Sequence, residues 1–77
     1  MTQIIIKFKT PQIMERTKNR LEESTAKFSV DNTLENTLQI PIRFVDGSTM
    51  NGWIKLNLSN HDIIILDMWD VEYFYIG

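Results

Sequence analysis

Cysteine is absent from the 77 residues of this chain, and histidine occurs once. Without cysteine, no disulfide bond and no thiolate metal site can stabilise the fold. A chain of this length lies near the size at which one hydrophobic core only just outweighs the entropy lost on folding. We therefore expect a single domain over residues 1–77 that depends on dense apolar packing or on association with other chains.

Hydrophobic runs long enough to cross a membrane are also absent. The three isoleucines at residues 4–6 are followed directly by Lys7, so the run is far shorter than a signal-peptide core or a membrane span. The lack of cysteine is compatible with a reducing compartment. We expect a cytoplasmic protein without a membrane partner.

Residues suited to catalysis or metal binding are few. His61 stands beside Asp62 in a predicted turn, but no serine or cysteine nucleophile is indicated to complete a catalytic set. The acids Asp67, Asp70 and Glu72 have neither the spacing nor the turn glycine of a calcium loop. We predict a protein without enzyme activity, cofactor or metal site.

The net charge of -2 conceals an asymmetry along the chain. Residues 1–28 carry six basic and three acidic side chains, whereas residues 29–77 carry two basic and seven acidic ones. Two interpretations remain open. The two halves attract each other, within the fold or in a head-to-tail contact, or the acidic half faces a basic partner.

Hydrophobic periodicity predicts one helix and five strands. Alternation of apolar and polar residues indicates strands at residues 3–9, 38–45, 49–58, 62–67 and 71–76. Thr10 and Pro11 are typical of a helix start, and the apolar stripe that follows predicts a helix over residues 11–28. Residues 29–36 read as a loop, and Asp46-Gly47 predicts a tight hairpin turn.

These elements predict an α+β fold in the order β-α-β-β-β-β. One helix packs on a five-stranded, mainly antiparallel sheet, which is either open or curled toward a small SH3-like barrel. One narrow helix covers only part of one sheet face. We assign to the covered face Ile4, Ile6, Phe8, Ile40, Ile42, Phe44, Ile54 and Leu56.

The other face then holds a second apolar set, made of Ile5, Val45, Trp53, two of the isoleucines at 63–65, Tyr73 and Tyr75. This set is too large to leave in water on a monomer. Either a barrel buries both sets, or a second molecule covers the remainder. We expect a homo-oligomer.

The C-terminal segment is the main candidate for a binding site. Aromatic residues among charges are typical of protein interfaces, although large aromatics are also ordinary core in a small domain. The predicted partner-binding residues are Trp53, Asp67, Trp69, Asp70, Glu72, Tyr73 and Tyr75. They predict a non-enzymatic protein-binding module of the inhibitor, immunity or phage and mobile-element accessory type, whose partner has a basic surface.

Two other functions stay open. The basic residues Lys7, Lys9, Arg16 and Arg20 form the alternative nucleic-acid-binding set, although glutamates share the same helix and favour a solvated face. The second alternative is an oligomer that binds a small ligand between its subunits.

The segment at residues 40–67 resembles the first motif of Sm-like RNA-binding proteins, through Asp46-Gly47, Gly52 and an apolar strand after Asp62. The resemblance implies an SH3-like barrel, ring-shaped oligomers and RNA binding at the turn before that strand. Two positions depart from the family pattern. Asp62 stands where the family has asparagine, and no arginine precedes Gly77. These departures remove the groups that would hold RNA.

Overall fold

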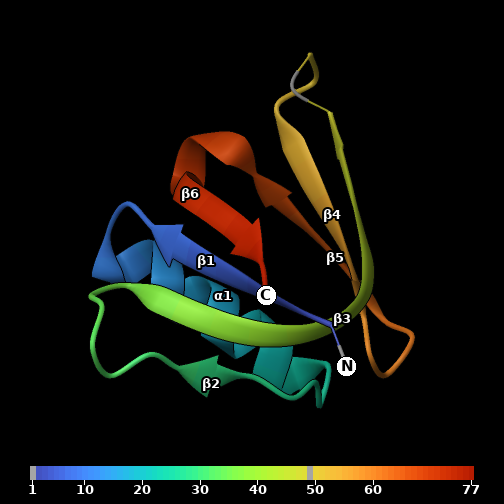
Figure 1. Cartoon of the computed structure of the whole chain (residues 1–77), viewed down its shortest axis with the longest axis horizontal. Helices are drawn as coiled ribbons and strands as arrows, with labels where there is room; N and C mark the ends of the chain where they lie inside the picture. The colour runs from blue at the N-terminus through green and yellow to red at the C-terminus, as the bar shows by residue number, and fades with distance from the viewer. Residues whose placement is uncertain (1, 49) are drawn as a thin grey trace.

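The computed structural model describes residues 2–48 and 50–77. It contains one helix and an antiparallel sheet, as predicted, with one further strand of two residues in the expected loop (Figure 1). In chain order the elements are β1 (Gln3–Phe8), α1 (Pro11–Glu23), β2 (Ser29–Val30), β3 (Thr37–Ser48), β4 (Trp53–Leu58), β5 (Ile63–Asp67), the 3-10 helix η1 (Met68–Asp70) and β6 (Val71–Ile76).

The strand β3 holds the sheet together, because it pairs with three other strands. The order across the sheet is β5-β4-β3-β1-β6, with β2 alongside β3. The first part of β3 pairs with β1 and β2, and its last part pairs with β4. Figure 1 shows the two resulting halves of the sheet at a steep angle to each other. The sheet therefore curls, but β5 and β6 form no ladder among the described residues.

The bend lies where β3 changes partners. Pro41 stands between Gln39, which pairs with β2, and Ile42, which pairs with β4, so its missing N–H falls where that edge has no partner strand. A β-bulge follows between Ile42 and Phe44. A bulge shifts the alternation of side chains by one position. Phe44, which we assigned to the covered face, is accordingly 49% exposed.

The bulge also changes the position of Val45. We assigned Val45 to the uncovered face, but it packs against the core cluster. Ile5 was assigned to the same face and is only 5% exposed, between Gln39 on β3 and Tyr75 on β6. The assignments of Phe44 and Val45 were wrong because they assumed an unbroken alternation along β3, whereas Ile5 does lie on the predicted face and is covered there.

The helix α1 begins where the sequence predicts. The hydroxyl of Thr10 accepts a hydrogen bond from the backbone N–H of Ile13 at 3.2 Å, and Pro11 occupies the first turn. Its end at Glu23, five residues before the predicted one, is a Schellman motif. Ala26 N–H donates to the Leu21 carbonyl, and Thr25 adopts a left-handed φ of 57°. Threonine in place of the usual glycine leaves no sequence signal for this end.

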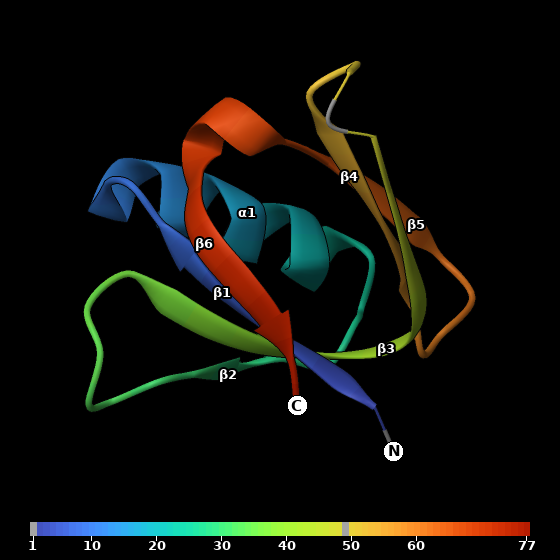
Figure 2. The same cartoon turned by 45° about the horizontal axis from the view of Figure 1, so that its top comes forward.

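The helix lies on the concave side of the sheet and reaches the free edge of β5 (Figure 2). Its buried residues Thr17 and Leu21 face the core. Arg20 Nη1 donates to the carbonyl of Ile65 in β5 at 3.1 Å. At the helix end, Ser24 Oγ donates to the carboxylate of Asp62 at 2.5 Å. The single helix therefore covers the core and the β5 end of the sheet together.

The loop after β2 is organised by the carboxylate of Asp31. It accepts hydrogen bonds from Thr33 Oγ1 at 2.7 Å, from Thr33 N–H at 2.8 Å and from Leu34 N–H at 3.2 Å. These bonds, first among them the one from the Thr33 hydroxyl, hold the pKa of Asp31 below its ordinary value. The loop thus closes on itself and brings the chain back to the start of β3.

The Asp46-Gly47 hairpin turn was predicted wrongly. Gly47 lies within β3 and pairs with Ile54, and the connection to β4 comes later in the chain. Gly52, with φ of 69°, is the glycine that adopts a left-handed conformation there. The predicted strand start at Thr49 lies outside the described residues.

We therefore predict that Gly52→Val lowers the melting temperature and that Gly47→Val has a smaller effect. A β-branched residue is strained at positive φ by about 1–3 kcal/mol, and each kcal/mol shifts a domain of this size by about 4–8 °C. A Cβ at Gly47 meets only the Trp53 carbonyl, at 3.7 Å. Calorimetry of both variants, with Gly52→Asn as a milder substitution, checks this. Equal losses in the two valine variants would contradict it.

Candidate functional site

The largest group of exposed apolar side chains in the last part of the chain lies on η1 and β6. We call it the C-terminal surface and define it by Trp69, Tyr73, Phe74, Tyr75 and Ile76. Trp69 is 78% exposed, and the carboxylate of Asp67 accepts a hydrogen bond from Trp69 N–H at 2.9 Å that fixes the turn of η1. The predicted aromatic residues of this segment are thus solvent-accessible.

Both faces of β6 contribute to this surface. Tyr73 and Tyr75 lie on the outer face, with ring centroids 6.5 Å apart and ring planes at 18°. Phe74 and Ile76 pair with Ile6 and Ile4 of β1 and share their core face. Whereas the two β1 residues are fully buried, Phe74 is 36% and Ile76 is 51% exposed. Val71, at the start of β6, still belongs to the core cluster, and the rest of the strand extends beyond the core.

The outer edge of β6 has no partner strand. Gln3 and Gly77 exchange both of their backbone hydrogen bonds. Because such pairs alternate along an antiparallel ladder, Tyr73 and Tyr75 also point their N–H and C=O groups toward β1. Phe74 and Ile76 must then point theirs away from it. Among the described residues no other strand pairs with β6, so these groups face solvent.

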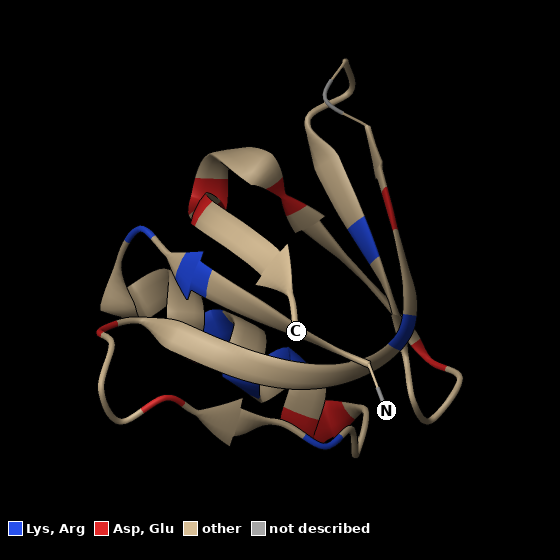
Figure 3. Cartoon of the chain, viewed as in Figure 1, with Lys and Arg blue, Asp and Glu red and all other residues tan. Residues whose placement is uncertain are grey.

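Basic residues from the first half of the chain lie beside this acidic segment (Figure 3). Lys7 Nζ is 3.9 Å from Glu72 Oε2, and Arg16 Nη2 is 3.5 Å from Asp70 Oδ2. The two halves of the chain therefore do attract each other within the fold. Exposed pairs of this kind contribute only about 0–1 kcal/mol each, but they balance the negative charge of the segment.

Two lysines also lie over the aromatic rings. Lys9 Nζ is 5.4 Å from the centroid of Trp69, and Lys7 Nζ is 6.0 Å from that of Tyr73. These are cation–π distances. The alternative nucleic-acid-binding residues Lys7, Lys9 and Arg16 thus form part of the rim of the C-terminal surface. The fourth, Arg20, bonds to β5.

The structure separates two of the predicted partner-binding residues from the rest. Trp53 and Asp67 lie opposite each other on β4 and β5, at the other end of the strand order from β6. Asp67 still acts on the C-terminal surface, through its bond to the backbone of Trp69. Trp53 belongs to the outer face of β3, β4 and β5.

That outer face carries two exposed isoleucines of the predicted second apolar set, Ile63 and Ile65, together with Phe44, which we assigned to the covered face. Phe44 and Ile63 are 49% and 53% exposed and flank Asn57 on the neighbouring strand β4. Asn57 is 8% exposed, and its Nδ2 has no hydrogen-bond partner among the described residues. The bulge in β3 creates this arrangement by turning Phe44 outward, and a bulge leaves no clear signal in a single sequence.

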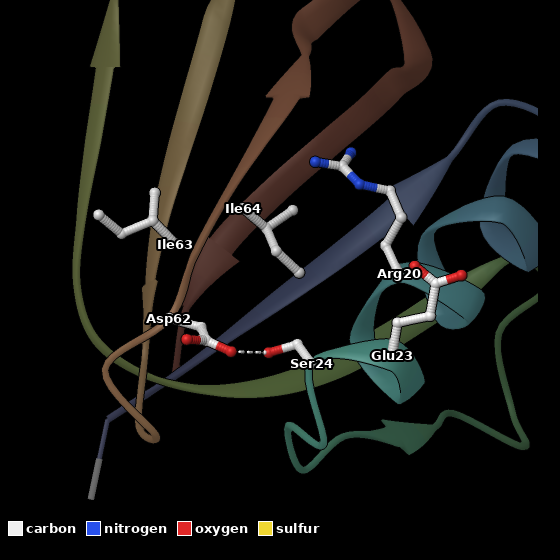
Figure 4. A pocket seen from close by; sticks show the side chains of 6 residues that line it. All are labelled: Arg20, Glu23, Ser24, Asp62, Ile63 and Ile64. Carbon is white, nitrogen blue, oxygen red and sulfur yellow. Dashed lines mark hydrogen bonds between the residues drawn. The ribbon is translucent and has the colours of Figure 1, made fainter.

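The polar groups near the end of α1 are already engaged. A shallow pocket is lined by Arg20, Glu23, Ser24, Asp62, Ile63 and Ile64 (Figure 4). Ser24 is bound to Asp62, and Arg20 to the β5 backbone. The single histidine, His61, has its Nδ1 2.9 Å from Arg43 Nη1. These groups hold the helix and the turn in place.

Groups of three or more potential metal ligands are absent among residues 2–48 and 50–77. The helix α1 is too short and too polar to cross a membrane.

Comparisons with protein-family models, with curated proteins and with solved structures found no match to this chain. The resemblance of residues 40–67 to Sm-like proteins therefore has no support from a family model.

We predict that Trp69→Ala leaves the fold intact. Removal of a mostly exposed side chain changes stability by about 0.5 kcal/mol or less, which corresponds to a shift of no more than about 4 °C. Leu56→Ala, at a fully buried position, serves as the contrast and should lose about 2–5 kcal/mol. Thermal unfolding followed by circular dichroism measures both. A loss in Trp69→Ala that approaches that of Leu56→Ala would make Trp69 a core residue.

We also predict that Asn57→Val stabilises the protein. A buried polar group without a partner costs about 1–3 kcal/mol, and valine suits a half-buried strand. The melting temperature should rise by several degrees, at about 4–8 °C per kcal/mol. Lys55→Val on the same strand and face is the control, because it adds a β-branched residue without relieving an unbonded amide. An equal rise in both variants would contradict the role of Asn57.

Proposed function

We propose that this chain is a protein-binding module that acts through the C-terminal surface. The observation that carries the proposal is the character of β6, an edge strand with large apolar side chains on both faces and an unpaired backbone edge. Natural proteins usually protect such edges with charged residues, proline or a covering element. In β6 the only charge is Glu72, at the start of the strand.

The residue types on this surface favour binding to a protein. Tryptophan and tyrosine are the commonest binding hot spots, since they bury about 150–250 Å² each and have few rotatable bonds to immobilise. The stacking of Tyr73 on Tyr75 and the cap that fixes Trp69 further reduce the entropy that binding must remove. A partner therefore meets a largely ordered surface.

The charges around the aromatic residues set the choice of partner. Asp70 and Glu72 contribute negative charge, whereas Lys9 and Arg16 contribute positive charge nearby. A partner with charges of both signs fits this rim better than a uniformly basic one. The activity we propose is non-enzymatic, in the manner of a small inhibitor, immunity protein or phage and mobile-element accessory protein.

The proposal predicts that Trp69→Ala and Tyr73→Ala, alone and together, weaken binding to the partner. The partner is captured from host cells with the tagged wild-type chain, identified, purified and titrated by calorimetry. The double variant should lose at least about 30-fold in affinity, because each hot-spot truncation costs more than about 1 kcal/mol. The matched control is Phe44→Ala, which removes an aromatic residue of similar exposure from the other apolar surface.

Two outcomes would contradict this proposal. The first is a partner whose affinity is lost in Phe44→Ala and kept in the double variant. The second is a purified partner that is a nucleic acid, held by Lys7, Lys9 and Arg16 with a steep dependence on salt.

Asp70→Lys tests the role of the rim. The substitution puts a third positive charge beside Arg16 and Lys9, and rim charges act mainly on the encounter of the partners. The association rate constant should change several-fold at low salt, while the dissociation rate constant stays nearly constant. Surface plasmon resonance at two salt concentrations measures both. A change confined to dissociation would place Asp70 in the centre of the interface.

A further inference from the structure

The strand order β5-β4-β3-β1-β6 ends in β5 and β6, and the two-residue strand β2 forms a further short edge beside β3. The edges of β5 and β6 differ in their surroundings. The edge of β5 is contacted by α1: Arg20 donates to the outward carbonyl of Ile65, and Ser24 donates to the side chain of Asp62 just before the strand. The edge of β6 has no such cover among the described residues. The last part of β3 also has an open edge, but it follows a bulge and carries Arg43 and Asp46, which discourage strand pairing.

This difference between the edges of β5 and β6 favours one way of pairing two copies of the chain. A head-to-tail pairing of β6 with β5 of another copy would have to displace Arg20 from the Ile65 carbonyl, so a chain of copies is disfavoured. Pairing of β6 with β6 of a second copy meets no such obstruction. Two identical edges related by a two-fold axis form a closed dimer.

We propose that a second copy of this chain pairs antiparallel with β6, in a register centred on Phe74. The inference rests on the proposed function in placing the contact at the C-terminal surface. In this register Phe74 lies opposite Phe74 of the second copy, and Ile76 lies opposite Glu72. The outward N–H and C=O groups of Phe74 then bond to those of its counterpart.

The side chains of the strand suit this register. The only charge of β6, Glu72, lies beside an isoleucine rather than beside its own copy, which avoids a like-charge pair. On the outer face, Tyr73 lies opposite Tyr75 of the second copy, at the close cross-strand distance that favours aromatic pairs. On the core face, Phe74 gains the apolar neighbour that it lacks in one chain, and Ile76 has Phe74 of the second copy as its diagonal neighbour.

The dimer enlarges the surface that binds the protein partner. The tyrosine pairs of the two copies form one continuous aromatic strip on the outer face of a sheet that runs through both chains. The two Trp69 side chains stand at its opposite ends, because η1 precedes β6 in each copy. Partner binding and self-association therefore use different parts of β6, the outer face and the backbone edge.

Sedimentation equilibrium and hydrogen exchange of the wild-type chain test this directly. As the protein concentration increases, the average molecular mass should rise from 9.1 kDa toward twice that value. The expected dissociation constant of the dimer is on the order of 10–100 µM, as for a small interface. The amides of Phe74 and Ile76 should exchange quickly at low concentration and at least ten-fold more slowly at high concentration. The Tyr75 amide, bonded to β1, should be protected at both.

Proline substitution tests the backbone edge. Phe74→Pro removes an N–H that β1 does not use, whereas Phe74→Ala removes only the side chain. Phe74→Pro should dimerise at least ten-fold more weakly than Phe74→Ala, with Ile76→Pro against Ile76→Ala as a second pair if the first proline variant unfolds. A protein that stays monomeric at about 300 µM, well above the range expected for a small interface, or a dimer with unchanged exchange at Phe74 and Ile76, would overturn the proposal.

The two proposals fail separately. A monomer that still loses its partner in the Trp69→Ala and Tyr73→Ala double variant contradicts the dimer alone. A dimer whose affinity for the partner is unchanged by those substitutions contradicts the proposed binding surface alone.

Discussion

The fold depends on where the single short helix, α1, lies on the sheet. Among the described residues the sheet does not close on itself, so its strand order ends at β5 and at β6, and α1 has thirteen residues with which to cover these ends. The hydrogen bond from Arg20 to the Ile65 carbonyl and the bond between Ser24 and Asp62 join the helix to the β5 end. Toward β6 the helix reaches Asp70 of η1 through Arg16. The β6 end then remains open, together with the apolar side chains that β6 carries. The exposed surface is thus a consequence of the placement of the helix.

The bend of β3 determines which apolar residues are available for such a surface. Pro41 removes a donor where β3 has no partner on that side, and the bulge before Phe44 turns the strand. These two features bring β4 and β5 across the core, so that Ile54, Leu56, Ile64 and Leu66 are nearly fully buried. Val71, at the start of β6, completes this core. Phe74 and Ile76 are therefore free to serve a contact outside the chain.

Much of the fold follows from the sequence, and the exceptions have physical reasons. The start of α1 was predicted correctly because Thr10 and Pro11 act locally. Its end was missed because Thr25 takes the left-handed position usually held by glycine. The Asp46-Gly47 turn was wrong because local turn propensity gave way to the pairing of Gly47 with Ile54. The contact between α1 and the edge of β5 could not be predicted, since it joins Arg20 to Ile65, 45 positions apart.

The absence of cysteine permits a direct test of the central claim, that β6 is a free edge which receives a second copy. Phe74→Cys introduces the only thiol of the chain. In the register centred on residue 74 the two Cα atoms are about 5.5 Å apart, which suits a disulfide bond. Mild oxidation should convert the variant to a covalent dimer, whereas Ile63→Cys, at an exposed position on β5, should stay monomeric. Equal cross-linking of the two variants, or none at position 74, would contradict the account.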